Sequence, residues 1–224
     1  MKSLLEEKDL IWSAVVANIA MNRDRNASGI NSYEKEFKFI PAAFLEKKIE
    51  QRGHAAWLDI CCGSGWALMQ TAAILAVKGL QQKASLTGID LLDTFPPLDK
   101  NITCLQWEVR SVVNWQPQRT YDLITCSHGL HYLGDKLQVI RMAASALQPH
   151  GYFVAHLDLQ NIQVNGRAAT AKLFTGHGFN YQHRNRLISC SGPLLFNYPC
   201  TYQGADDTTG PNYTGQGAVT SCYE

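Results

Sequence analysis

The chain has 224 residues, of which 46% are hydrophobic and 17% are charged, and this is typical of one domain with a buried core. The 20 Lys and Arg residues nearly balance the 19 Asp and Glu residues, so the formal net charge is only +1. A chain with this balance has no strong positive field to hold a phosphate backbone, which argues against nucleic acid as the partner.

The sequence carries no signal for secretion, for a membrane span or for a disulfide framework. The first eight residues are largely charged, where a signal peptide needs an apolar stretch. The longest apolar run, residues 66–77, is too short to cross a bilayer. The 7 cysteines lack framework spacing, and Cys126, His128 and His131 make an incomplete zinc ligand set. We therefore predict a cytoplasmic protein without a membrane partner or a bound metal.

Two helices are expected before the first strand. Apolar residues recur at helical spacing over residues 4–21 and predict an amphipathic helix there. Residues 22–33 are polar and rich in Asn, which indicates an irregular segment. Pro41 suits the first turn of a second helix, and Gly53 suits its end.

Short apolar strands then alternate with helices through the middle of the chain. The expected strands cover residues 55–60, 84–90, 102–107, 121–126 and a fifth that leads from Gly151 through Leu157, and the expected helices cover residues 66–78 and 136–147. Buried strands of this length that alternate with helices are typical of a parallel sheet covered on both faces. The fold class is therefore predicted to be α/β.

The pattern changes in the last third of the chain. A helix is expected over residues 168–174, followed by strand-like residues 181–190 and 194–203. The short link Ser191-Gly192-Pro193 between these two segments indicates an antiparallel hairpin at the edge of the sheet. We therefore divide the chain into a helical cap, a ligand-binding domain and a polar tail, which cover residues 1–53, 54–204 and 205–224.

A glycine turn after the first strand marks the expected ligand site. Asp59 precedes the turn Gly63-Ser64-Gly65, and an apolar helix follows it, which is the arrangement of a ligand site in an open α/β sheet. Asp90 ends the next strand, where a carboxylate can accept both hydroxyls of a ribose, and Glu108 follows the third strand. Leu68 stands where a dinucleotide fingerprint needs its third glycine, and no phosphate-binding Gly-Lys-Ser/Thr loop occurs.

Four segments in order point to one family. They read WLDICCGSG at residues 57–65, TGID at 87–90, YDLITCS at 121–127 and LQPHGYFV at 147–154. Together they resemble the motifs of the class I S-adenosylmethionine-dependent methyltransferases, and the resemblance covers about residues 55–158. The sequence departs from the family at Cys61, where the first Gly of the turn is common, and at His150, where a second Gly is frequent.

The resemblance implies a Rossmann-like, mostly parallel sheet of seven strands with an antiparallel edge hairpin. It also implies S-adenosyl-L-methionine as the cofactor and S-adenosyl-L-homocysteine as its product. By position, Gly63, Ser64 and Gly65 would cradle the methionine moiety. Asp59 would support its amino group, and Asp90 would hold the ribose. Further contacts with the cofactor are expected from Tyr33, Cys61, Leu91, Glu108, Val109, Cys126 and Ser127, with Glu108 or Val109 at the adenine.

A catalytic residue is harder to name, because an activated methyl group needs placement of its acceptor more than it needs a base. The candidates lie at strand ends above the sheet. His128 and His131 follow the fourth strand, and we predict His128 as a base or acceptor-orienting group; His156 and Asp158 follow the fifth strand. Residues 23–33 and 210–215 are candidates for covering the substrate.

Other activities stay open at this point. A noncatalytic S-adenosylmethionine sensor or partner subunit would keep the glycine turn and lack an acceptor pocket. An oxidoreductase that uses a nicotinamide cofactor would share the turn and Asp90. Family members that methylate nucleic-acid bases usually have Asn/Asp-Pro-Pro-aromatic after the fourth strand, and Cys126-Ser127-His128-Gly129 stands there instead. Together with the neutral charge, this favours a small-molecule acceptor.

Overall fold

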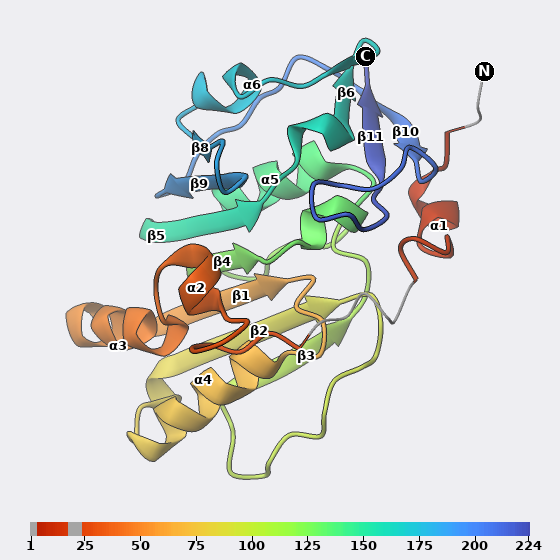
Figure 1. Ribbon diagram of the computed structural model, residues 1–224. Helices are drawn as coiled ribbons and strands as arrows, with labels where there is room; N and C mark the ends of the chain where they lie inside the picture. Colours follow the sequence, from red (N-terminus) through yellow and green to blue (C-terminus); the bar gives the residue numbers. More distant parts are fainter. Residues whose placement is uncertain (1–3, 18–23) are drawn as a thin grey trace.

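The computed structural model describes residues 4–17 and 24–224. Its main sheet has seven strands in the order β3-β2-β1-β4-β5-β9-β8 (Figure 1). Neighbours among β1 to β5 pair in parallel, while β9 pairs antiparallel with both β5 and β8. The strands are β1 (Ala55–Ile60), β2 (Ala84–Asp90), β3 (Leu105–Val109), β4 (Tyr121–Cys126), β5 (Leu147–His156), β8 (Asn180–Gln182) and β9 (Leu187–Ser191). The predicted α/β sheet with an antiparallel edge is confirmed.

Helices cover both faces of this sheet. The helices α3 (Pro41–Arg52) and α4 (Trp66–Val77) pack on one face, and α5 (Lys136–Ser145) packs on the other (Figure 1). Successive residues of a strand point to opposite faces, so Trp57 packs with α3 and α4, whereas Leu58 packs with α5. Within the described residues, no helix has the length and apolar character needed to cross a membrane.

Two strand boundaries differ from the prediction. The third strand covers Leu105–Val109, so it starts later than the expected residues 102–107. The fifth strand starts at Leu147, ahead of Gly151, because the pairing of β4 with β5 shifts register between Tyr121 and Leu123. This irregularity accommodates Pro149, which a regular central strand would exclude.

The edge hairpin is built from other residues than expected. The segment predicted as one strand, residues 181–190, is divided between β8 and β9, which extend one residue beyond it at either end, and the polar residues 183–186 form the turn between them. Residues 194–201 form no strand. The predicted helix over 168–174 shrinks to α6 (Lys172–Thr175). A hairpin places its polar residues in the turn, so the turn forms at residues 183–186. It does not form at Ser191-Gly192-Pro193, where the sequence pattern had indicated it.

The expected helix over residues 4–21 is wrong for the part that the structure describes, and residues 18–21 lie outside it. Only α1 (Glu7–Leu10) is helical, and residues 11–17 form turns. Leu5 instead pairs with Ala205 through two backbone hydrogen bonds of 2.8 and 3.0 Å. After the irregular segment, Ser32 caps a short helix, α2 (Tyr33–Phe37).

The last residues, predicted as a polar tail, contribute strands to a second sheet. The strand order is β10-β11-β6-β7 (Figure 1). Its strands are β10 (Tyr202–Asp206), β11 (Thr220–Tyr223), β6 (Ile162–Val164) and β7 (Arg167–Ala168). Val219 and Tyr223 are at most 1% exposed, because they pack against Leu10 and the α5 side of the core. Burial of these apolar side chains holds the segment against the main domain.

Lys136 joins the main domain to this second sheet. It is the first residue of α5 and is fully buried. Its Nζ donates hydrogen bonds to the carbonyl oxygens of Leu133 and Val219 and to Oγ of Ser221, at 2.9, 2.7 and 3.0 Å. Burial opposes the charged form and lowers the pKa of Lys136 to about 7.

This buried lysine gives a pH-dependent stability. Since its pKa is about 7 in the folded protein and about 10.5 when the chain unfolds, only the unfolded state holds the proton between these values. The unfolding free energy of the wild type, relative to Lys136→Met, should therefore rise from pH 7 to pH 10, by at most about 4 kcal/mol. Urea unfolding of both proteins across this range measures the difference, and a flat difference would contradict the assignment.

Candidate functional site

A cavity opens at the carboxyl ends of the parallel strands, where ligands bind in open α/β sheets. It holds about 1010 Å³, counting its mouth. The wall is built from the turns that follow β1, β2, β3 and β4, which supply residues 61–63, 90–92, 110–112 and 127–129. The N-terminal segment covers it from one side with Glu7, Leu10, Ile11 and Val16, and Gln216 from the second sheet region completes the wall.

Asp90 ties the glycine turn to the end of β2. Its Oδ2 accepts a hydrogen bond from the backbone N–H of Gly63 at 2.8 Å, and its Oδ1 accepts one from Leu92 at 3.1 Å. Burial raises the pKa of Asp90, and these backbone donors partly oppose the rise. Asp90 is 8% exposed and lines the cavity, so it can still reach a ligand.

Asp59 lies behind the cavity wall and reaches it through a tyrosine. Its two oxygens accept hydrogen bonds from the hydroxyls of Tyr33 at 2.7 Å and Thr125 at 2.6 Å. Burial raises the pKa of Asp59 to about 7, although both hydroxyls favour the charged form. Tyr33 lines the cavity and Asp59 does not, so Asp59 is placed to orient the tyrosine.

The two ends of the glycine turn differ in what surrounds them. Cys61 and Gly63 line the cavity, with φ angles of 52° and 60°. Ser64 and Gly65 lie outside the cavity lining, and the hydroxyl of Ser64 donates to Asp24 at 2.6 Å. A Cβ atom at Gly65 would lie 2.5 Å from the ring of Trp107. Gly65 is therefore required by its φ of 73° and by the packing of an aromatic ring.

Gly65→Val is expected to lower the unfolding free energy by about 2–5 kcal/mol and to weaken binding of S-adenosylhomocysteine. The new side chain would both strain the backbone and displace Trp107. Cys61→Gly is the matched control in the same turn, because glycine adopts the positive φ of that position without strain. Chemical unfolding and calorimetry measure both variants. A stable Gly65→Val protein with wild-type affinity would contradict this account of the turn.

The expected contacts from the third strand are not at the cavity. Glu108 accepts a hydrogen bond from Nε1 of Trp115 at 2.8 Å and lies outside the lining, as does Val109, which is 50% exposed. The lining begins one residue later, with Arg110, because β3 starts and ends later than predicted. Leu91 does line the cavity, as expected.

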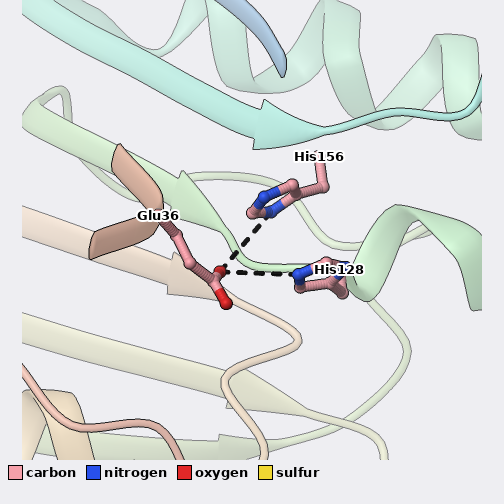
Figure 2. A group of neighbouring side chains, drawn as sticks. All are labelled: Glu36, His128 and His156. Atoms are coloured by element: carbon pink, nitrogen blue, oxygen red, sulfur yellow. Dashed lines mark ion pairs between the residues drawn. The ribbon is translucent and has the colours of Figure 1, made fainter. Parts of the chain in front are cut away.

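Three side chains from distant segments meet beside the cavity: Glu36 from α2, His128 after β4 and His156 at the end of β5 (Figure 2). Oε2 of Glu36 lies 3.5 Å from Nε2 of His128 and 3.7 Å from Nδ1 of His156. The two imidazole rings are stacked, with centroids 3.8 Å apart. Nδ1 of His128 lies 3.5 Å from the hydroxyl of Tyr213.

The charge of this cluster is held on Glu36. Burial alone would raise its pKa, but His128, an ion pair with Arg25 and a hydrogen bond from Ser127 together lower it to about 2. Burial and the neighbouring His128 lower the pKa of His156 to about 3, so this ring is neutral at physiological pH. The cluster thus presents one carboxylate and an unprotonated imidazole.

The structure separates the candidates that follow β4. Ser127 and His128 line the cavity, whereas Cys126 is fully buried in the core and His131 is 1% exposed outside the lining. Neither ring nitrogen of His131 has a hydrogen-bond partner among the described residues, and burial lowers its pKa well below the usual range. His131 packs under Tyr213 and cannot reach a substrate in this cavity, so the prediction of a catalytic role is not supported by its position.

Several residues at the cavity could not be found from sequence spacing. Arg25 and Gln216 in the cavity wall, and Glu36 beside it, come from segments without a motif, and the sequence placed Gln216 in a polar tail. Asp158 accepts a backbone hydrogen bond from Tyr213 at 3.1 Å and so anchors the loop that brings Tyr213 and Gln216 to the site. Only long-range packing brings these side chains together.

The comparison with known families decides between the open activities. The family model described as "Methyltransferase domain" matches residues 29–189, which is more than half of the chain. The chain belongs to this family. It is therefore an S-adenosylmethionine-dependent methyltransferase of class I, and the resemblance read from the four motifs is confirmed. The nicotinamide-dependent alternative is set aside, and no curated protein sequence matches the chain.

Solved structures of methyltransferases are similar to the chain at low sequence identity. The N-methyltransferase NodS from Bradyrhizobium japonicum WM9, in complex with S-adenosyl-l-homocysteine, is 14% identical with a TM-score of 0.47, and the match covers 81% of this chain and 100% of that one. The plantazolicin methyltransferase BpumL is 18% identical with a TM-score of 0.45, over 72% and 56% of the two chains. A putative methyltransferase from Listeria monocytogenes is 13% identical with a TM-score of 0.41, over 80% and 77%.

Proposed function

We propose that this methyltransferase transfers the methyl group of S-adenosylmethionine to a small-molecule acceptor with an oxygen, nitrogen or carbon nucleophile. The observation that carries the proposal is one cavity that holds the glycine turn, Asp90 and His128 and that the N-terminal segment covers. A covered cavity excludes water and suits a small ligand better than a polymer. The neutral net charge of the chain supports the same choice.

The cavity wall fits the cofactor's groups in order. At one end, Asp90 already accepts backbone hydrogen bonds, and a carboxylate has about four lone-pair sites, so it retains capacity for ribose hydroxyls. Leu91 and Val112 supply apolar wall for the adenine ring, in place of Glu108 and Val109. At the other end, Tyr33 and the backbone of Gly63 would hold the methionine moiety.

His128 and Ser127 would face the acceptor at the end of β4. His128 is 21% exposed, lines the cavity and is followed by Gly129. A Cβ atom at Gly129 would lie 2.2 Å from Cβ of Cys61, so this position also lets the loop after β4 approach the glycine turn. The close approach would bring the acceptor and the methyl donor into one site.

For methyl transfer, the main contribution of the protein is to place the acceptor beside the methyl donor. When bound, S-adenosylmethionine supplies a methyl group that its sulfonium already activates. The residues of the chain hold the acceptor in line, exclude water through the cover formed by Leu10 and Ile11, and orient the nucleophile through His128. Location in the cytoplasm and the absence of a nucleic-acid partner stay predictions from the sequence.

Consumption of the methyl donor in the presence of a metabolite library tests the proposal. We expect S-adenosylhomocysteine to accumulate only with particular acceptors, and mass spectrometry should show one added methyl group on each of them. Calorimetry with S-adenosylhomocysteine tests cofactor binding separately. Tight cofactor binding with no turnover on any small molecule, and turnover on a protein or nucleic acid instead, would overturn the small-molecule assignment.

A further inference from the structure

The cluster of Glu36, His128 and His156 has the donor set of a metal site. Two imidazole nitrogens and one carboxylate oxygen lie within 4.8 Å of one another, and His128 among them lines the cavity (Figure 2). Three such protein ligands with an open fourth position are the arrangement of catalytic zinc sites, and nitrogen with oxygen ligands suits first-row divalent cations. No motif in the sequence indicates this set, because its members come from three separate elements.

The spacing of the three atoms fits a shared cation better than direct hydrogen bonds. Both nitrogens face the same oxygen, Oε2 of Glu36, at 3.5 and 3.7 Å, which is longer than a good hydrogen bond. A tetrahedral zinc ion with ligands at about 2.0–2.1 Å separates its ligand atoms by about 3.3 Å. The two rings are stacked with an interplanar angle of 13°, so binding of one ion requires both rings to rotate about their Cα–Cβ and Cβ–Cγ bonds until their nitrogen lone pairs converge.

His156 supplies an independent indication. Its side chain is 7% exposed, and its Nδ1 has no hydrogen-bond partner among the described residues while it points toward Glu36 (Figure 2). An unpaired buried nitrogen is costly, since it has lost water and gained nothing in return. A cation at this place would use the lone pair that the neutral imidazole offers.

The neighbouring side chains suit the same site. Tyr213 lies 3.5 Å from Nδ1 of His128, so a proton on Nδ1 leaves the lone pair of Nε2 for a metal. Arg25 pairs with Oε1 of Glu36, the oxygen that the imidazoles do not face, and fixes the carboxylate. The positive charge of Arg25 repels a metal cation bound nearby, so we expect the affinity for the metal to be below that of a structural zinc site.

We propose that Glu36, His128 and His156 bind a divalent first-row transition metal ion of the zinc or cobalt type beside the cavity. This departs from the prediction of no bound metal. His128 and Ser127 line the cavity, so an oxygen or nitrogen of the acceptor can complete the coordination from that side. Coordination would lower the pKa of an acceptor hydroxyl or amine, which would release its proton to solvent at the mouth of the cavity as the acceptor binds. This role rests on the proposed function, whereas the metal site itself does not.

Titration of the cofactor-free protein with Co²⁺ alone, followed by visible absorption, tests the site, and calorimetry with Zn²⁺ repeats the test. We expect one Co²⁺ per chain, in a four-coordinate site. Groups that only orient metal ligands contribute about 10–100-fold in affinity, so Glu36→Gln and His128→Asn should each weaken binding by at least that much. His150→Ala is the matched control, because His150 is exposed at the opposite end of β5.

Each outcome decides the proposal. Absence of Co²⁺ binding overturns it, and so does binding that the two variants leave unchanged. An intense thiolate-to-metal absorption band would also overturn it, because cysteines such as Cys61 would then be the ligands. Glu36→Asp should restore part of the affinity, which distinguishes a ligand from a residue needed only for folding. If the protein binds Co²⁺ and does not bind S-adenosylhomocysteine, the metal site stands and the proposed function is rejected. If it binds S-adenosylhomocysteine and does not bind Co²⁺, the proposed function stands and the metal site is rejected.

Discussion

Asp90→Ala is expected to weaken the binding of S-adenosylhomocysteine by about 30- to 1,000-fold, which corresponds to about 2–4 kcal/mol. The substitution removes the carboxylate that we propose for the two ribose hydroxyls. It also removes the acceptor that holds the backbone N–H groups of Gly63 and Leu92 in place. Both effects reduce affinity, since the turn would lose its preformed shape as well as its ribose contact.

Calorimetry on three proteins separates these effects. Asp93→Ala removes an exposed carboxylate three residues away, outside the cavity lining, and should bind like the wild type. Asp90→Asn keeps one carbonyl oxygen and should retain part of the affinity. Unchanged affinity in a folded Asp90→Ala protein would remove Asp90 from the cofactor site.

Substitution of His128 is expected to lower turnover by about 10²–10⁴-fold and to leave cofactor affinity nearly unchanged. His128 is the imidazole at the cavity wall, and its contacts with Glu36 and Tyr213 fix its ring. The loss arises because the acceptor is no longer oriented beside the methyl donor.

The choice of substitution matters, because His128 has a φ of 61°. Asparagine is among the non-glycine residues that best tolerate this left-handed conformation, so His128→Asn separates loss of the imidazole from backbone strain. Turnover, melting temperature and cofactor affinity should be measured together with His128→Ala, His128→Gln and the exposed control His150→Ala. Turnover of His128→Asn within a few-fold of the wild type would leave placement by the rest of the cavity as the mechanism.

Local patterns were sufficient to predict the central sheet. The strands β1, β2 and β4 have the predicted bounds, because each is a short, mostly apolar run bounded by turn-forming or polar residues. Pro41 and Gly53 marked the ends of α3 correctly, since their backbone angles suit those positions alone. The edge and the termini were predicted poorly, because pairing with a distant strand decided them, as for Leu5 with Ala205.

By itself, the sequence determined the family and the glycine turn with its Asp90 partner. These features are local, because a strand, a turn and a helix that are adjacent in the chain set their geometry. Only the tertiary structure shows that Glu36, His128 and His156 lie together. It also shows that His131 and Glu108 lie outside the cavity lining and that the last residues belong to a second sheet. Contacts between side chains from distant segments depend on how whole helices and strands pack, and this packing cannot be predicted from the spacing of residues along the chain.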